Sequence, residues 1–202
     1  MRTVKSATTS RAYRMTRRAA LVDETRRQIT AAAARLHTTI GPANTTVAGI
    51  AEEAGVTRLT VYRHFPDLDT LFEACRAHWR AQNPPPDPAR WATIPALSDR
   101  VRQAFDGLYG WYAEHADELF PIYRDMEISP ESSQARMRVE NRRLGDHLLD
   151  GHVPVGRRGK EARALARHLL DYRTWRSLTV EQGLRHGEAV DLAVRLVLDA
   201  TA

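Results

Sequence analysis

The sequence lacks most features that mark secreted, membrane or catalytic proteins. Cys75 is the one cysteine in 202 residues, which excludes an internal disulfide framework and fits a reducing cytoplasm. No apolar run approaches the ~20 residues of a membrane span, and the N-terminus has no signal-peptide core. Phosphate-binding glycine loops, HExxH and nucleophile motifs are absent, and the histidines are scattered. We therefore expect a cytoplasmic protein that is not an enzyme and holds neither a metal nor a cofactor.

Acidic residues are missing from the first 22 positions. Up to Arg80 there are 13 Lys and Arg against 7 Asp and Glu, which leaves 17 against 18 for the rest of the chain. The basic excess therefore lies in the N-terminal part, where it favours a polyanionic partner such as DNA. Residues 1–21 are basic, contain Ser and Thr and show no apolar period, so we predict a flexible arm. This arm either follows the DNA backbone or is a disordered tail.

Residues 45–71 hold two short helices separated by a glycine turn. Apolar residues recur at the spacing of one helical face in Val47, Ile50, Ala51 and Ala54. Thr45 or Thr46 can cap the start of this helix, and Gly55 follows its end, where a left-handed turn suits glycine.

The second helix, Thr57–His64, has a basic and aromatic outer face. Thr57 can cap it, and Val61 and Phe65 form its inner face. The outer residues are Arg58, Leu59, Thr60, Tyr62, Arg63 and His64, with no acid among them. A solvated helix face usually mixes both charges, so this pattern favours a helix-turn-helix DNA reader over an ordinary αα-hairpin.

This stretch resembles the DNA-binding segment of the tetracycline-repressor (TetR) family. The resemblance lies in residues 46–51 (TVAGIA), 54–56 (AGV) and 60–65 (TVYRHF), followed by Leu71. Many members place a lysine near the start of the next helix to hold a phosphate, where this chain has Leu68 between Asp67 and Asp69. The grip on phosphate is therefore expected elsewhere, in the N-terminal arm, Arg26 and the Thr57–His64 face.

The two-helix reader implies a role for each exposed residue. Arg58 is the best candidate for bidentate contact with guanine, while Thr60 and Leu59 can meet a thymine methyl group. Tyr62, His64 and Thr46 suit phosphates, which position without specifying, and Arg63 suits either partner. Arg26, near the start of a helix expected from about Asp23 to His37, is a further phosphate candidate.

The remaining periodicity predicts an all-α chain of two domains. A helix-turn-helix domain over 22–82 precedes a helical ligand-binding and dimerisation domain over 83–202, with the boundary at the proline-rich residues 83–88. Helices are expected over 68–80, 98–114 with Ser98 as its cap, 117–126, 131–150, 160–182 and 188–200.

The last helix is apolar around most of its circumference, which predicts burial on several sides. Its own core on one side and a second copy on the other would satisfy that, as the family resemblance implies. The predicted interface comprises Leu165, Leu169, Tyr172, Ala189, Leu192, Ala193 and Leu196. A monomeric bundle with a central last helix is the alternative.

Aromatic residues after position 90 suit a small-molecule pocket between helices. The candidates are Phe105, Tyr109, Tyr112, Phe120, Tyr123, Met126 and Trp175, each of which could instead be core. The sequence thus predicts a ligand-responsive, homodimeric repressor of a pseudo-palindromic DNA operator. The rival hypotheses are a helical enzyme or ligand-binding protein with an incidental basic unit, and an architectural DNA-binding protein without ligand.

Overall fold

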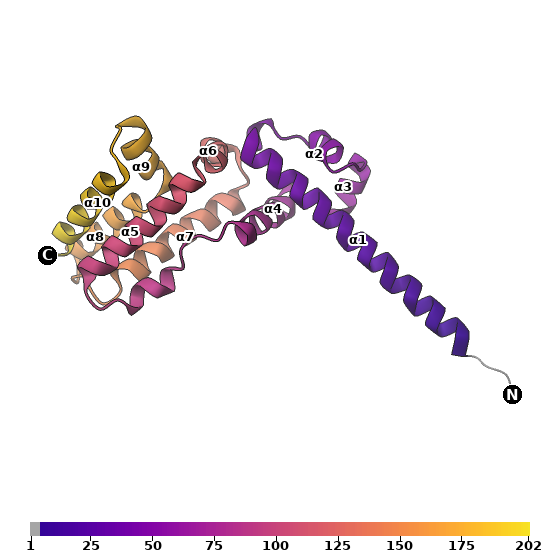
Figure 1. The fold of residues 1–202 in the computed structure, drawn as a ribbon, viewed down its shortest axis with the longest axis horizontal. Coiled ribbons are helices and arrows are strands. Elements are labelled where there is room, and N and C mark those ends of the chain that lie inside the picture. The colour runs from indigo at the N-terminus through magenta and orange to yellow at the C-terminus, as the bar shows by residue number, and fades with distance from the viewer. Residues whose placement is uncertain (1–4) are drawn as a thin grey trace.

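A computed structural model describes the backbone of residues 5–202 and the side chains from residue 15 onward. Within this part of the chain every regular element is helical, as predicted (Figure 1). The N-terminal elements are α1 (Lys5–Thr39), η1 (Pro42–Asn44), α2 (Val47–Glu53), α3 (Arg58–His64) and α4 (Leu68–Gln82). The C-terminal ones are η2 (Pro88–Thr93), α5 (Leu97–Glu114), α6 (Ala116–Arg124), η3 (Met126–Ile128), α7 (Glu131–Leu149), α8 (Arg157–Leu169), α9 (Tyr172–Arg176), η4 (Ser177–Glu181) and α10 (His186–Thr201).

Helix α1 is far longer than predicted. It begins at Lys5 instead of near Asp23, so the prediction of a flexible arm is wrong for residues 5–21, and residues 1–4 lie outside the described chain. No glycine or proline interrupts residues 5–39, and helix-favouring Ala and Arg are frequent there. The helix ends where Gly41, at a φ of 90°, and Pro42 follow it. Figure 1 shows its N-terminal half projecting past α3, away from the C-terminal helices.

The N-terminal domain packs around a small core contributed by all four helices. Ile29, Ala32 and Ala33 of α1 meet Ile50 and Ala51 of α2 in this core, which the following residues complete: Val61, Phe65, Leu71 and Cys75. The apolar period of residues 47–54 and the inner face of Thr57–His64 thus point inward as predicted.

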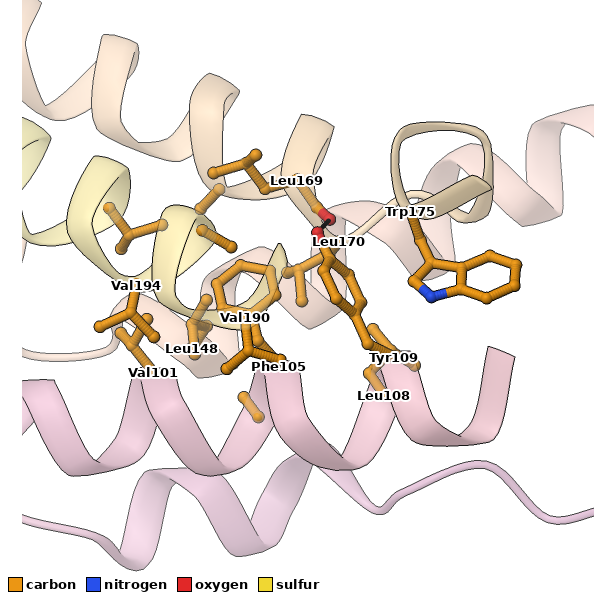
Figure 2. Packing of buried hydrophobic residues seen from close by; sticks show 14 of the residues in the cluster. Val101, Phe105, Leu108, Tyr109, Leu148, Leu169, Leu170, Trp175, Val190 and Val194 are labelled. Atoms are coloured by element: carbon orange, nitrogen blue, oxygen red, sulfur yellow. Dashed lines mark hydrogen bonds between the residues drawn. The ribbon is translucent and has the colours of Figure 1, made fainter. Parts of the chain in front are cut away.

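The C-terminal domain is a bundle in which α10 packs against α5 and α8. Figure 2 shows Val101, Phe105 and Tyr109 of α5 facing Val190 and Val194 of α10 across the core. The Tyr109 hydroxyl donates to the carbonyl of Leu169 at 2.8 Å, and the Tyr112 hydroxyl donates to that of Leu170 at 2.8 Å. These bonds tie α5 to the end of α8.

Two predicted features of this domain are wrong. The helix expected over 160–182 is three pieces, because α8 ends at Leu169 and the Asp171 carboxylate caps a new helix through the N–H of Arg173 at 2.8 Å. Ser98 does not cap α5, which starts at Leu97 with Ala96 as its cap residue. A serine one residue away from a helix start is a weak signal, since helix ends are set by tertiary packing as well as by caps.

Helix α4 joins the two domains. It runs from the helix-turn-helix to the linker at residues 83–88 and packs on both α1 and α7. No helix in residues 5–202 is both long and apolar enough to span a bilayer.

Candidate DNA-binding surface and ligand cavity

The helix-turn-helix has the caps and the turn that its sequence predicts. Thr46 accepts from the N–H of Gly49 at 3.0 Å at the start of α2, and Thr57 accepts from the N–H of Thr60 at 3.2 Å at the start of α3. Gly55 lies between them at a φ of 66°, a conformation that costs glycine little. Each cap satisfies a backbone donor that would otherwise lack a partner.

The outer face of α3 is open to solvent. Leu59 is 78% exposed and Tyr62 53% exposed, although both are large and apolar or aromatic. Arg58 and Arg63 are also exposed, and neither makes an ion pair within the described residues. Thr60 is half-buried, and its hydroxyl lies 2.9 Å from that of Thr57. An exposed, acid-free helix with unpaired arginines suits a major groove.

Arg26 lies in a different place from the one predicted. It is 21 residues inside α1, so no free helix N-terminus surrounds it, and the backbone reason for choosing it is wrong. Its guanidinium stacks on the Phe65 ring at 4.0 Å and donates to the carbonyl of His64 at the end of α3. Arg26 thereby holds the end of the recognition helix against α1.

His64 does not carry a positive charge to this surface at neutral pH. Partial burial, and then the neighbouring charges of Arg63 and Arg26, lower the pKa of His64 below its usual value of 6.5. A neutral imidazole still donates one hydrogen bond to a phosphate oxygen.

Residues 29–75 match a family model described as bacterial regulatory proteins, tetR family. These residues therefore form a DNA-binding domain of the TetR family, and the chain that carries it is a DNA-binding transcriptional regulator. Over the whole fold it is similar to the crystal structure of a TetR-like transcriptional regulator from Rhodococcus sp. RHA1, with a TM-score of 0.59. That match covers 86% of this chain and 93% of the other at 20% identity, which shows a shared fold. No curated protein matches the chain.

A cavity of about 280 Å³ lies where this regulator's two domains meet. Its walls come from the end of α1, from α4, and from α5, α6, η3 and α7. Aromatic walls are formed by Phe72 and Trp79 of α4, Trp111 and Tyr112 of α5, and Tyr123 of α6. Because α4 directly follows the helix-turn-helix in the chain, a molecule in this cavity contacts the helix that connects the cavity to the DNA-binding surface.

The structure places three of the seven predicted pocket residues in this cavity: Tyr112, Tyr123 and Met126. Phe105, Tyr109 and Trp175 are instead buried in the bundle core, and Phe120 is 39% exposed on the surface. The prediction is wrong for these four. Trp79, Trp111 and Met137 were missed as cavity residues, although all three were recognisable as apolar residues of their helices.

Polar groups in the cavity wall are mostly paired. Arg76 and Arg80 of α4 both bind the carboxylate of Glu140 on α7, the latter at 3.2 Å. Trp79 donates from Nε1 to Glu118 at 3.2 Å. Among the described residues, the buried Nε1–H of Trp111 has no acceptor, so it is a free donor at the cavity wall.

Two buried residues of the cavity lining, His37 and Cys75, form a neutral pair, with Nδ1 of His37 3.3 Å from Sγ of Cys75. Burial lowers the pKa of His37 to about 4 and raises the pKa of Cys75 to about 12. The described residues contain no cluster of His, Cys, Asp or Glu able to hold a metal ion.

The predicted dimer residues divide into two groups. Leu169, Tyr172, Ala189 and Ala193 are buried in the protomer's own core, so the prediction that they face a second copy is wrong. Leu165, Leu192 and Leu196 are only half-buried and belong to α8 and α10. The apolar residues around α10 predicted that this helix is buried on several sides. They did not predict which side packs against the protomer's own bundle.

Proposed function

We propose that this chain is a cytoplasmic, non-enzymatic repressor that binds a pseudo-palindromic operator as a homodimer and is released by a small molecule. The observation that carries the proposal is the continuity of one helix. Helix α4 begins about one turn after the exposed recognition helix, and over its next three turns the Phe72, Arg76 and Trp79 side chains line the cavity.

The reader is α3. Arg58 makes the bidentate contact with guanine, and Leu59 and the methyl of Thr60 meet thymine methyl groups. Thr46, Thr57, Tyr62 and His64 grip phosphates, and Arg63 serves either partner. Arg26 contributes indirectly by fixing the end of α3. Leu68 is exposed between two acidic residues and adds no positive charge.

The N-terminal half of α1 supplies additional electrostatic attraction. From Arg26 back to Lys5 an α-helix covers about 30 Å, and no acid occurs before Asp23. Arg17 and Arg18 are exposed on this extension. Because it projects on the side of α3, it can lie along phosphates outside the bases read by the recognition helix (Figure 1).

The switch is a shift between two conformers. A ligand that prefers the conformer with the wrong distance between the two recognition helices weakens DNA binding by its differential affinity for the two conformers. Two-fold symmetry sets the half-sites about one helical turn, ~34–36 Å, or a multiple of it apart.

The test is selection of bound duplexes from a random pool, followed by gel shift on the selected and on scrambled DNA. A regulator of this kind enriches an inverted repeat and prefers it over scrambled DNA by roughly 10³-fold or more. Equal affinity for all sequences would favour the architectural alternative. Absence of any DNA binding at physiological salt would favour the ligand-binding alternative.

A further inference from the structure

A second hollow adjoins the cavity and differs from it in charge. It is an open groove of about 920 Å³ between the end of α6, α7 and the α8–α9 junction. The cavity and the groove adjoin along five shared lining residues: Tyr123, Met126, Met137, Asn141 and Asp171.

The lining of the groove is rich in arginine. It includes five arginines and two carboxylates: Arg124, Arg138, Arg142, Arg167 and Arg173, with Glu127 and Asp171. Three of these arginines already pair with carboxylates outside or beside the groove, namely Arg124 with Asp125, Arg138 with Glu131 and Arg167 with Asp146. Arg173 donates to the carbonyl of Tyr123 at 3.2 Å, which keeps its guanidinium at the boundary with the cavity.

Arg142 is the free cation of this groove. It is exposed on α7, and it has no ion-pair or hydrogen-bond partner within the part of the chain that the structure describes. The next residue toward the N-terminus, Asn141, lines both hollows and is fixed by its bond to the carbonyl of Arg167 at 3.0 Å.

Along α4 the cavity offers no free cation among the described residues, because Arg76 and Arg80 are both neutralised by Glu140. Within the same part of the chain, the unpaired arginine of its lining is Arg143 of α7, which is exposed to solvent and is the neighbour of Arg142 in the chain. An ionised group on a ligand would therefore lose hydration beside α4 without gaining a partner, whereas toward the groove it meets an unpaired guanidinium group.

We propose that the ligand is an amphipathic anion. Its role as an effector rests on the proposed function. Its apolar body fills the cavity between α4, α5 and α7, and its carboxylate or phosphate lies in the groove beside Arg142 and Arg173. A neutral molecule of the same shape lacks the charged contact, and a cationic one is repelled by the unpaired guanidinium group of Arg142.

The test compares three probes with one tail, namely octanoate, 1-octanol and octylamine, by titration calorimetry on the full chain without DNA. Octanoate is expected to bind at least ~10-fold more tightly than 1-octanol, and octylamine most weakly, with the preference for octanoate shrinking as salt rises. Equal or tighter binding of 1-octanol, or no binding of any probe at millimolar concentration, would overturn the proposal.

The variant Arg142→Gln locates the charged contact. It should lower the octanoate-to-octanol affinity ratio at least ~3-fold while leaving the affinity for 1-octanol unchanged, which shows that the cavity is intact. Arg195→Gln is the matched control, because Arg195 on α10 is also exposed and has no partner among the described residues, and it should leave the ratio as in the wild type. An unchanged ratio in Arg142→Gln contradicts the site. Because these titrations contain no DNA, the proposed ligand class stands or falls separately from repression, which is tested by release of the selected operator.

Discussion

A carboxylate oxygen of Asp125 accepts from the backbone N–H of Ala43 at 2.9 Å, across 82 residues of chain. Ala43 lies in η1, directly before the helix-turn-helix, and Asp125 lies between α6 and η3. Arg124 completes the contact by donating to the carbonyl of Ile40 at 3.0 Å and binding Asp125 at 2.7 Å. A Cβ on Gly41 would collide with both side chains, so this close approach requires glycine. The DNA-binding domain is thus tied to the segment that contributes Tyr123 and Met126 to the cavity.

Asp125→Asn should uncouple the cavity from DNA. The Arg124 guanidinium beside it lowers the pKa of the Asp125 carboxyl, and the asparagine lacks the charge on which this pairing depends. The ratio of operator Kd values with and without saturating octanoate should fall at least ~3-fold, because the two sites lose a shared contact. Fluorescence anisotropy on labelled operator measures this ratio, and calorimetry should show octanoate affinity unchanged. Glu161→Gln, which removes a carboxylate from an exposed pair on α8, is the control. A ratio equal to that of the wild type would contradict coupling through the Asp125 contact.

Arg58→Ala should cost about 1–3 kcal/mol on the selected operator and relax specificity at one base pair of each half-site. The reason is that an exposed, unpaired guanidinium at the start of α3 can form two bonds to guanine. Competition gel shifts with single-base operator variants measure the loss. Arg157→Ala, on the distant α8, should have no effect, and equal weakening on every sequence would assign Arg58 to phosphate instead.

Arg17→Gln with Arg18→Gln should weaken binding to all duplexes. Two phosphate contacts contribute about 1–2 units to the slope of log K against log salt concentration, so the slope should flatten by about that amount. The matched control is Arg157→Gln with Arg158→Gln, an adjacent exposed pair with the same change in net charge. If both double variants flatten the slope equally, the α1 extension makes no contact of its own.

The helix-turn-helix was predictable from the sequence because its signals are local. Thr46, Gly55 and Thr57 act within four residues of their partners, and the inward face of α3 follows from spacing alone. The cavity was not, because Tyr109 and Trp111 lie on opposite sides of α5, and the sequence does not show which side packs into the core and which lines the cavity. The α1 extension was missed for a related reason. Residues 5–21 have no apolar stripe, so the sequence pattern did not indicate a helix there. The helix depends on backbone propensity and on continuity with the packed half of α1.

Acid should destabilise the protein through His37. Its pKa is about 4 in the folded chain and near 6.5 when exposed, so the unfolded state binds more protons between these values. The His37 contribution is therefore complete above pH 6.5, declines as the pH falls and levels off below about pH 4, with a maximum loss of about 3 kcal/mol. Urea unfolding at a series of pH values measures this slope. His37→Phe should flatten it between pH 6.5 and 4, whereas His152→Phe, at a half-buried loop position, should not. A wild-type slope in His37→Phe would place the acid sensitivity elsewhere.

Leu192→Asp should split the proposed homodimer. On α10 the residues Ala189, Ala193 and Val197 face the protomer's own core, while Leu192 and Leu196 are half-buried on another side, beside a stripe of exposed charges. Together with Leu165 of α8 they form the apolar surface that a second copy would cover. A charge placed there would lose hydration in the dimer without a partner, so the mass in light scattering should drop from twice 22.8 kDa to 22.8 kDa.

The operator affinity of Leu192→Asp should fall with the loss of the second half-site, while helix content by circular dichroism stays unchanged. Val155→Asp, which adds the same charge at a fully exposed loop residue, controls for charge alone and should remain dimeric. A wild-type mass for Leu192→Asp would show that the two recognition helices are joined through another surface. A single-copy mass for the wild type would remove the pseudo-palindrome from the proposal, because only two-fold symmetry requires it.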